Sequence, residues 1–310
     1  MNGKAAVLLL SLFLPAHAGA ASAGDAMRHG VPAQSVPAWK LKASPHFEIY
    51  HEAGWAPNSI AIEMEKLYAS MRLNLSMFAP WMVKEKTKVY IHSSRETYLR
   101  GEFEPPSWSK GLAFTSKKTI VVYDSGDLDK LRAVIAHELT HLYFETYFAE
   151  KLKYPPQWLN EGLAVMMEDS SHSAEGGPWT TALKYMPRER FFGMRSYFAS
   201  ELSALNTDQK IGDWYLQAFG IVKHLYSPAQ RLQFRNFCEK IRDGAGLETA
   251  LWEVYRVRDA DHFEKKWAAW LDLYRSQDAP GFGRQQPSAS FNFQPVKLSS
   301  FGFTNFGGGK

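Results

Sequence analysis

Two histidines and a glutamate lie together in one short motif near the middle of the chain, His137-Glu138-Leu139-Thr140-His141. On a helix, residues four apart lie on the same face, so both imidazoles can ligate a single metal ion. Glu138 is displaced by about 100° around such a helix and can reach a water on the metal without ligating it. This pattern is typical of zinc-dependent hydrolysis with a glutamate as general base.

A catalytic zinc usually has a third protein ligand besides a water. Glu161 follows His141 by twenty residues, within the segment W-L-N-E-G-L-A at 158–164. Pro155-Pro156 would end the first helix and fold the next one back across it. We therefore expect Glu161 to lie near the two histidines and to complete the ligand set.

The elements that must position these residues form two halves of different character. Alternating apolar residues predict strands over 47–52, 89–91, 111–114 and 119–123, the last two joined by a polar hairpin turn. Helical spacing predicts helices over 59–79, 93–99, 127–148, 156–168, 195–204, 211–227, 228–242, 246–255 and 261–275. Asp127 is the expected N-cap of the helix that carries the two histidines. The predicted fold class is α+β, a small mixed β-sheet with helices followed by a mainly helical subdomain, with the metal site between them.

H-E-L-T-H followed by W-L-N-E-G-L-A resembles the gluzincin metallopeptidases, and within them the peptidase MA-like superfamily of thermolysin and aminopeptidase N relatives. The resemblance implies a zincin-like catalytic domain, a peptide or protein substrate, and one Zn²⁺ per chain held by His137, His141 and Glu161. It also implies that Glu138 is the base and proton shuttle. Glu168 matches a second acidic position of the family, where a role behind the metal ligands and a solvated helix-face acid are both open.

The resemblance further implies a tyrosine that donates to the oxyanion of the reaction. Tyr215 is 54 residues after Glu161 and matches that position, although Gln217-Ala218 stands where the family often has Lys-Gly. His224 is the alternative donor. The Gly-x-Met-Glu-Asn pattern with which aminopeptidases hold a free N-terminus is absent from the sequence, which favours an endopeptidase or an unusual substrate. The substrate is expected along a sheet edge, at 119–123 or at 111–114.

The two ends of the chain differ in composition from the middle. Lys4, an apolar run over 5–14 and A-x-A sites ending at Ala18 and Ala20 predict a signal peptide over 1–20, with an N-terminal anchor as the alternative. We expect a linker at 21–40, a catalytic domain at 41–275 (an α/β part at 41–125 and a helical part at 126–275) and a flexible Phe/Gly-rich tail at 276–310. The expected location is the periplasm or the outside of a bacterium, without stable membrane insertion after signal cleavage. The tail is a candidate contact for an envelope partner.

Composition excludes several other classes of protein. A net charge of +4 without a basic stripe gives little support to nucleic-acid binding. Cys238 is the only cysteine, which excludes an intramolecular disulfide and a Cys-based zinc site. Two alternative functions share the predicted metal site: a non-catalytic member of the same fold that binds peptides or envelope proteins, and a zinc hydrolase of a non-peptide amide.

Overall fold

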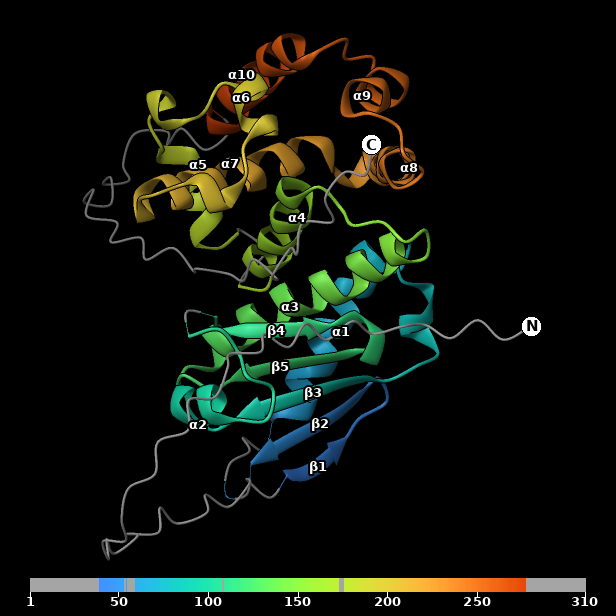
Figure 1. Cartoon of the computed structure of the whole chain (residues 1–310), viewed down its shortest axis with the longest axis vertical. Coiled ribbons are helices and arrows are strands. Elements are labelled where there is room, and N and C mark those ends of the chain that lie inside the picture. Colours follow the sequence, from blue (N-terminus) through green and yellow to red (C-terminus); the bar gives the residue numbers. More distant parts are fainter. Residues whose placement is uncertain (1–38, 53, 55–58, 108, 173–175, 277–310) are drawn as a thin grey trace, which may run out of the picture. The chain divides into compact units, whose positions relative to one another are not determined.

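The structure is a computed structural model that describes residues 39–52, 54, 59–107, 109–172 and 176–276. It contains a five-stranded sheet in the order β1-β2-β3-β5-β4 (Figure 1). The strands are β1 (Trp39–Ala43), β2 (Phe47–Glu52), β3 (Thr87–His92), β4 (Gly111–Phe114) and β5 (Thr119–Tyr123). β2, β3 and β5 are parallel, while β1 and β4 pair antiparallel at the two edges. Of the two segments predicted as the substrate-binding edge, only β4 is an edge, because β5 is an interior strand.

Alternate residues of the strands face two different layers, as the pleat of a β-sheet requires. One face packs against α1 (Ile60–Leu75) and α3 (Leu128–Ala149) through Phe47, Ile49, Val89, Ile91, Ile120 and Val122. The opposite face packs against the short helix α2 (Arg95–Arg100), where Tyr98, Leu112 and Val121 form a smaller buried cluster. The sheet thus packs against one side of α3. The other side of α3 is left for the helices that follow it in the chain.

The second half of the described chain is helical. Its helices are α4 (Gln157–Ser170), α5 (Pro178–Tyr185), α6 (Met194–Ala199), α7 (Asp208–Leu225), α8 (Arg231–Arg242), α9 (Leu247–Tyr255) and α10 (Ala260–Ser276). Short 3₁₀ turns lie at η1 (Pro80–Val83), η2 (Thr115–Lys117), η3 (Arg188–Arg190), η4 (Leu202–Ala204) and η5 (Pro228–Gln230). α4 packs on α3 on one side and on α7 on the other, so it joins the two halves of the fold.

The predicted mixed α+β class is confirmed, and several predicted elements differ from the observed ones. The strand β1 was not predicted, and its first residues, Trp39 and Lys40, lie in the predicted linker. The strand is half exposed and lacks the alternation of apolar residues by which strands are predicted. α5 is absent from the predicted helices, although Pro178 at its first position is a helix-start signal. The helix expected at 195–204 is α6 followed by η4, and 228–230 is η5 rather than the start of α8.

The predicted signal peptide at 1–20, nearly all of the linker at 21–40 and the tail from 277 onward lie outside the described residues. Within the part of the chain that the structure describes, no helix is both long enough and apolar enough to cross a bilayer.

Candidate metal centre

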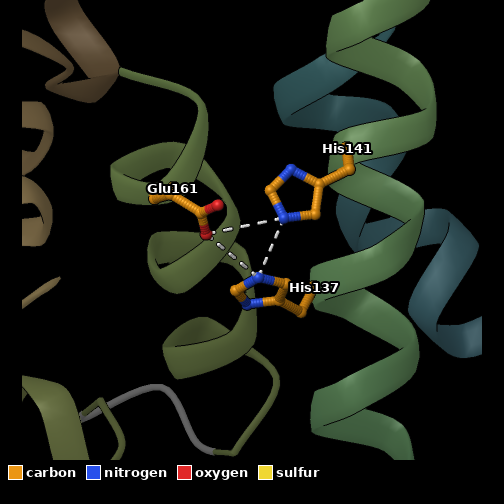
Figure 2. A group of neighbouring side chains, drawn as sticks. All are labelled: His137, His141 and Glu161. Carbon is orange, nitrogen blue, oxygen red and sulfur yellow. Dashed lines mark hydrogen bonds and ion pairs between the residues drawn. The ribbon is translucent and has the colours of Figure 1, made fainter. Parts of the chain in front are cut away.

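Both histidines of the first motif lie on α3, whose start and surroundings follow from its sequence. Asp127 is the N-cap, as expected, and its Oδ1 accepts hydrogen bonds from the backbone N–H groups of Asp129 and Lys130 at 3.0 and 3.1 Å. The middle of the helix is buried on all sides, between the sheet below and α4 above. His137 and His141 face α4, which places both imidazoles in the buried layer between the two helices (Figure 2).

Glu161 on α4 points at the two imidazoles (Figure 2). The Nε2 atoms of His137 and His141 lie 3.0 Å apart. Glu161 Oε2 lies 3.6 Å from each of them. The structure therefore brings together the three residues that the sequence predicted as metal ligands, and all three are buried.

The spacing of these three atoms suits a metal ion. Zinc bonds of about 2.0–2.2 Å at tetrahedral angles separate ligand atoms by about 3.3–3.5 Å. Glu161 Oε2 is buried and has no hydrogen-bond partner among the described residues. Three atoms that carry lone pairs thus converge without enough protons to pair them, an arrangement that a bound cation stabilises.

The pKa values of the two imidazoles are shifted in opposite directions. Burial alone would lower the pKa of His137, but the nearby carboxylate of Glu161 and the hydrogen bond to Glu168 outweigh burial and raise this pKa to about 10. Burial lowers the pKa of His141 to about 4, and the charge of Glu161 only partly opposes it.

Glu168 supports His137 from behind, which decides between the two roles left open for it. Its Oε2 lies 2.9 Å from His137 Nδ1, and its Oε1 accepts a hydrogen bond from Trp179 Nε1 at 3.1 Å. A carboxylate on Nδ1 fixes the tautomer and orientation of the imidazole and leaves Nε2 as the ligand atom. Glu168 is therefore a partner of a candidate metal ligand, and the helix-face alternative is wrong.

Asn160, the residue before Glu161, bonds to Glu145, a carboxylate near His141. Its Nδ2 donates to Glu145 Oε1 at 2.8 Å, and Glu145 Oε1 is 3.9 Å from His141 Nδ1. Hydrogen bonding by the Asn160 side chain opposes the effect of burial on the pKa of His141. Burial raises the pKa of Glu145 to about 7. The residue before Glu161 thus bonds to a carboxylate of α3, a contact that the sequence analysis missed.

Glu138 is enclosed beside the centre but does not belong to the group of three. It is fully buried, and neither of its carboxylate oxygens has a hydrogen-bond partner among the described residues. Burial, reinforced by Glu161 and Glu145, raises its pKa to about 8 against the opposing influence of His137. Gly111 on the edge strand β4 makes room for it, since a Cβ there would lie 2.6 Å from Glu138 Cγ. An unpaired buried carboxylate against the edge strand is suited to take and return a proton.

Tyr215 and His224 both lie on α7, but only one of them is near the centre. Tyr215 is buried, and burial raises its pKa well above the usual value, with further contributions from Glu161, Glu138 and Glu168. His224 instead packs against Phe263 and Trp270 of α10, at ring distances of 5.8 and 5.2 Å. The structure therefore places His224 against α10, and the oxyanion donor stays a prediction. Nine residues separate the two positions, about 900° of rotation, which places them on opposite faces of α7.

α7 can bring Tyr215 close to the centre because Gly162 allows a tight crossing with α4. A Cβ on Gly162 would lie 2.5 Å from the backbone oxygen of Ala218, well inside normal contact. The glycine after Glu161 is thus required by helix packing, a reason that is visible only once α7 is in place.

Comparison with known proteins is consistent with this geometry. No curated protein matches the chain. The sequence profile of the Peptidase MA superfamily matches residues 73–273, which is more than half of the 310 residues and includes both histidines and Glu161. The chain therefore belongs to the Peptidase MA superfamily.

Proposed function

We propose that this protein is a zinc-dependent metallopeptidase of the gluzincin type, related to thermolysin and aminopeptidase N. The observation that carries the proposal is the convergence of His137, His141 and Glu161 within 4.8 Å of one another, with Glu138 buried beside them. Two imidazoles and one carboxylate are a donor set that favours zinc over harder cations. When bound, the metal supplies Lewis acidity, which polarises a carbonyl and lowers the pKa of water toward about 7.

Glu138 acts as the proton carrier in this proposal. Its carboxylate accepts a proton from the attacking water and returns it to the leaving amine. Both carboxylate oxygens of Glu138 are buried and have no hydrogen-bond partner among the described residues, which leaves them available for these proton transfers. Tyr215 donates its hydroxyl hydrogen to the oxyanion that forms as the carbonyl is attacked.

The substrate lies along β4 in this proposal. β4 is an edge of the sheet, and its first residue, Gly111, contacts Glu138. A peptide that adds to this edge would place its backbone beside the proton carrier. Because the chain lacks a Gly-x-Met-Glu-Asn pattern, we propose cleavage within peptides rather than at a free N-terminus.

The predicted signal peptide supports export to the periplasm or the cell exterior, where the domain at 41–275 would act. In this proposal the protein binds one zinc ion per chain, acts on a peptide or protein and does not bind nucleic acid. An envelope partner for the segment at 276–310 also remains a proposal.

Metal content and cleavage test the function in two stages. Elemental analysis should find one zinc per chain in the wild type and none in His141→Ala. A peptide library should then be cleaved by the wild type but not by Glu138→Gln, which should keep its zinc. A wild type without zinc after metal is added back would contradict the proposal. A zinc-loaded wild type that binds peptides without cleaving them would indicate the non-catalytic binding protein, and cleavage of non-peptide amides alone would indicate the other hydrolase.

A further inference from the structure

Three connections of the chain meet at one end of the sheet, away from the metal centre. β3 and β5 are parallel and both begin at this end, where Lys88 pairs with Thr119. α3 runs antiparallel to β5 and ends at the same side (Figure 1, right). The connections are 84–86 before β3, 115–118 between β4 and β5, and 150–156 between α3 and α4. Trp81 links them, because its ring lies 5.5 Å from that of Tyr143 on α3 and 4.5 Å from Lys118 Nζ.

Positive charge dominates these connections. Five lysines are exposed there, and none forms an ion pair with a described residue: Lys84, Lys86, Lys117, Lys151 and Lys153. The two acidic residues in the same connections are already neutralised, since Glu85 contacts Lys118 and Glu150 lies 3.5 Å from Arg242. We call this group of five lysines the basic end. Its charge has no counterpart within the described part of the chain.

Leu152 projects from the middle of the basic end. Its side chain is 93% exposed and its backbone adopts a left-handed conformation, with φ of 54°. The turn is a helix C-terminus, closed by hydrogen bonds from Leu152 N to Ala149 O at 2.9 Å and from Lys153 N to Phe148 O at 3.2 Å. Glycine is the favoured residue at such a position, because a side chain is strained there. Neither local conformation nor burial therefore explains a leucine here.

Two further side chains with apolar surface accompany Leu152. Tyr154 is 74% exposed and Val83 is 44% exposed. A folded protein partner would need a pocket that matches the projecting side chain of Leu152. A lipid bilayer needs no such pocket, because its fluid surface can adapt to the side chain. Lipid headgroups supply the phosphates for the lysines, and the boundary of the acyl chains receives the leucine.

We propose that the basic end, with Leu152 at its tip, docks this protein onto the surface of an anionic phospholipid membrane. The interaction is peripheral, since a single turn enters only the headgroup boundary. The docking loop joins α3 to α4, the two helices that carry His137, His141 and Glu161. Docking uses none of the residues of the metal centre.

Sedimentation with lipid vesicles tests the proposal on the full chain. The probe is vesicles of phosphatidylcholine mixed with phosphatidylglycerol, compared with phosphatidylcholine alone, at low and high salt. Lys151→Gln with Lys153→Gln should weaken partitioning to the anionic vesicles about 30-fold, at about 1 kcal/mol per lysine and tenfold per about 1.4 kcal/mol. Leu152→Gly should weaken partitioning about tenfold for the loss of one partly buried leucine, while the melting temperature stays equal or rises.

The matched control is Lys265→Gln with Lys266→Gln on α10, which removes the same charge from exposed positions outside the basic end. It should leave partitioning within twofold of the wild type. All variants share residues 1–38 and 277–310, so a difference in partitioning between them does not come from those segments.

Three results would overturn the proposal. The first is a wild type that does not bind anionic vesicles at low salt. The second is an equal loss of binding in the two lysine pairs, which would show only a general charge effect. The third is a Leu152→Gly variant that keeps full binding to vesicles, which would indicate a site for a soluble polyanion instead.

Discussion

Replacing Gly162 with alanine should disturb the metal centre through helix packing alone. A Cβ at this position would lie 2.5 Å from the oxygen and 2.8 Å from the carbonyl carbon of Ala218, and 2.6 Å from Val222 Cγ2. Backbone atoms cannot rotate away as the end of a side chain can. Normal contact begins at 3.4 Å, so α4 and α7 must separate by about 0.9 Å at this point.

The energetic cost follows from two opposing contributions. Overpacking a rigid interior site costs about 1–3 kcal/mol, and contact with backbone favours the upper end of that range. Alanine returns about 1 kcal/mol because it has the better helix propensity. The expected net loss is about 2 kcal/mol in the free energy of unfolding, or about 4–8 °C in melting temperature for a domain of this size.

The same shift should weaken metal binding, because Glu161 is the neighbouring residue on α4. Metal–ligand distances tolerate changes of only about 0.2 Å, much less than the required displacement. We expect zinc affinity to fall by about 10–100-fold, comparable to the loss of a residue that orients a ligand. Competition with a chromogenic chelator measures this affinity, and urea denaturation of the metal-free protein measures the stability separately.

Gly220→Ala, on α7 rather than α4, is the matched control: it also adds a methyl group to a glycine inside a packed helix. Its Cβ would meet Leu183 Cδ1 at 3.0 Å and Trp267 Cζ2 at 3.3 Å, which belong to side chains rather than backbone. This variant should stay within about 1 kcal/mol of the wild type and keep its zinc affinity. If Gly162→Ala were as stable as the control and bound zinc equally well, the tight crossing of α4 and α7 would not position Glu161, and the reasoning would be refuted.

Three further predictions concern the residues around the centre. Burial raises the pKa of Glu138 from 4.5 to about 8, so its contribution to stability is fully present below about pH 4.5 and is lost as the pH rises through 8. Glu138→Gln should therefore stabilise the metal-free protein by about 2–5 kcal/mol at pH 8.5, and this gain in the free energy of unfolding should shrink toward pH 5. Urea titrations at both pH values measure the gain. A difference between the two proteins that does not change with pH would contradict the prediction. Trp179→Phe removes the donor to Glu168 and should weaken zinc binding about tenfold in chelator competition, whereas unchanged affinity would show that the indole does not hold Glu168 in place. Tyr215→Phe should lower kcat about 100–1,000-fold in a peptide-cleavage assay with zinc content unchanged, and a kcat near that of the wild type would remove Tyr215 from the mechanism.

The parts of the centre that the sequence predicted correctly are those with local causes. The spacing of His137 and His141 places two imidazoles on one helix face wherever that helix lies. Asp127 is an N-cap by its own side-chain chemistry, and the structure confirms this assignment. The proximity of Glu161 followed from the turn at Pro155-Pro156, which reverses the chain between two helices. Each inference needed only a short stretch of chain and a known helix geometry.

The parts that were missed depend on contacts between distant elements. Gly111 reads as an ordinary strand residue until β4 is placed against α3 and the carboxylate of Glu138. Asn160 reads as a polar helix residue until Glu145 faces it. The relative placement of Tyr215 and His224, in contrast, does not depend on distant contacts. Half a turn of rotation separates the two residues on α7. Helical geometry alone therefore shows that the two side chains cannot both face α4.

Three consecutive residues of α4 connect the centre to both of its neighbouring helices. Asn160 contacts Glu145 on α3, Glu161 points at both imidazoles, and Gly162 admits the backbone of α7. Because α7 also carries Tyr215, one turn of α4 sets the distances among the candidate ligands and the candidate oxyanion donor together. Side chains on packed helices are held more firmly than side chains on loops. The positions of these residues are therefore a property of the α3–α4–α7 packing, and a change in that packing should alter metal affinity before it unfolds the chain.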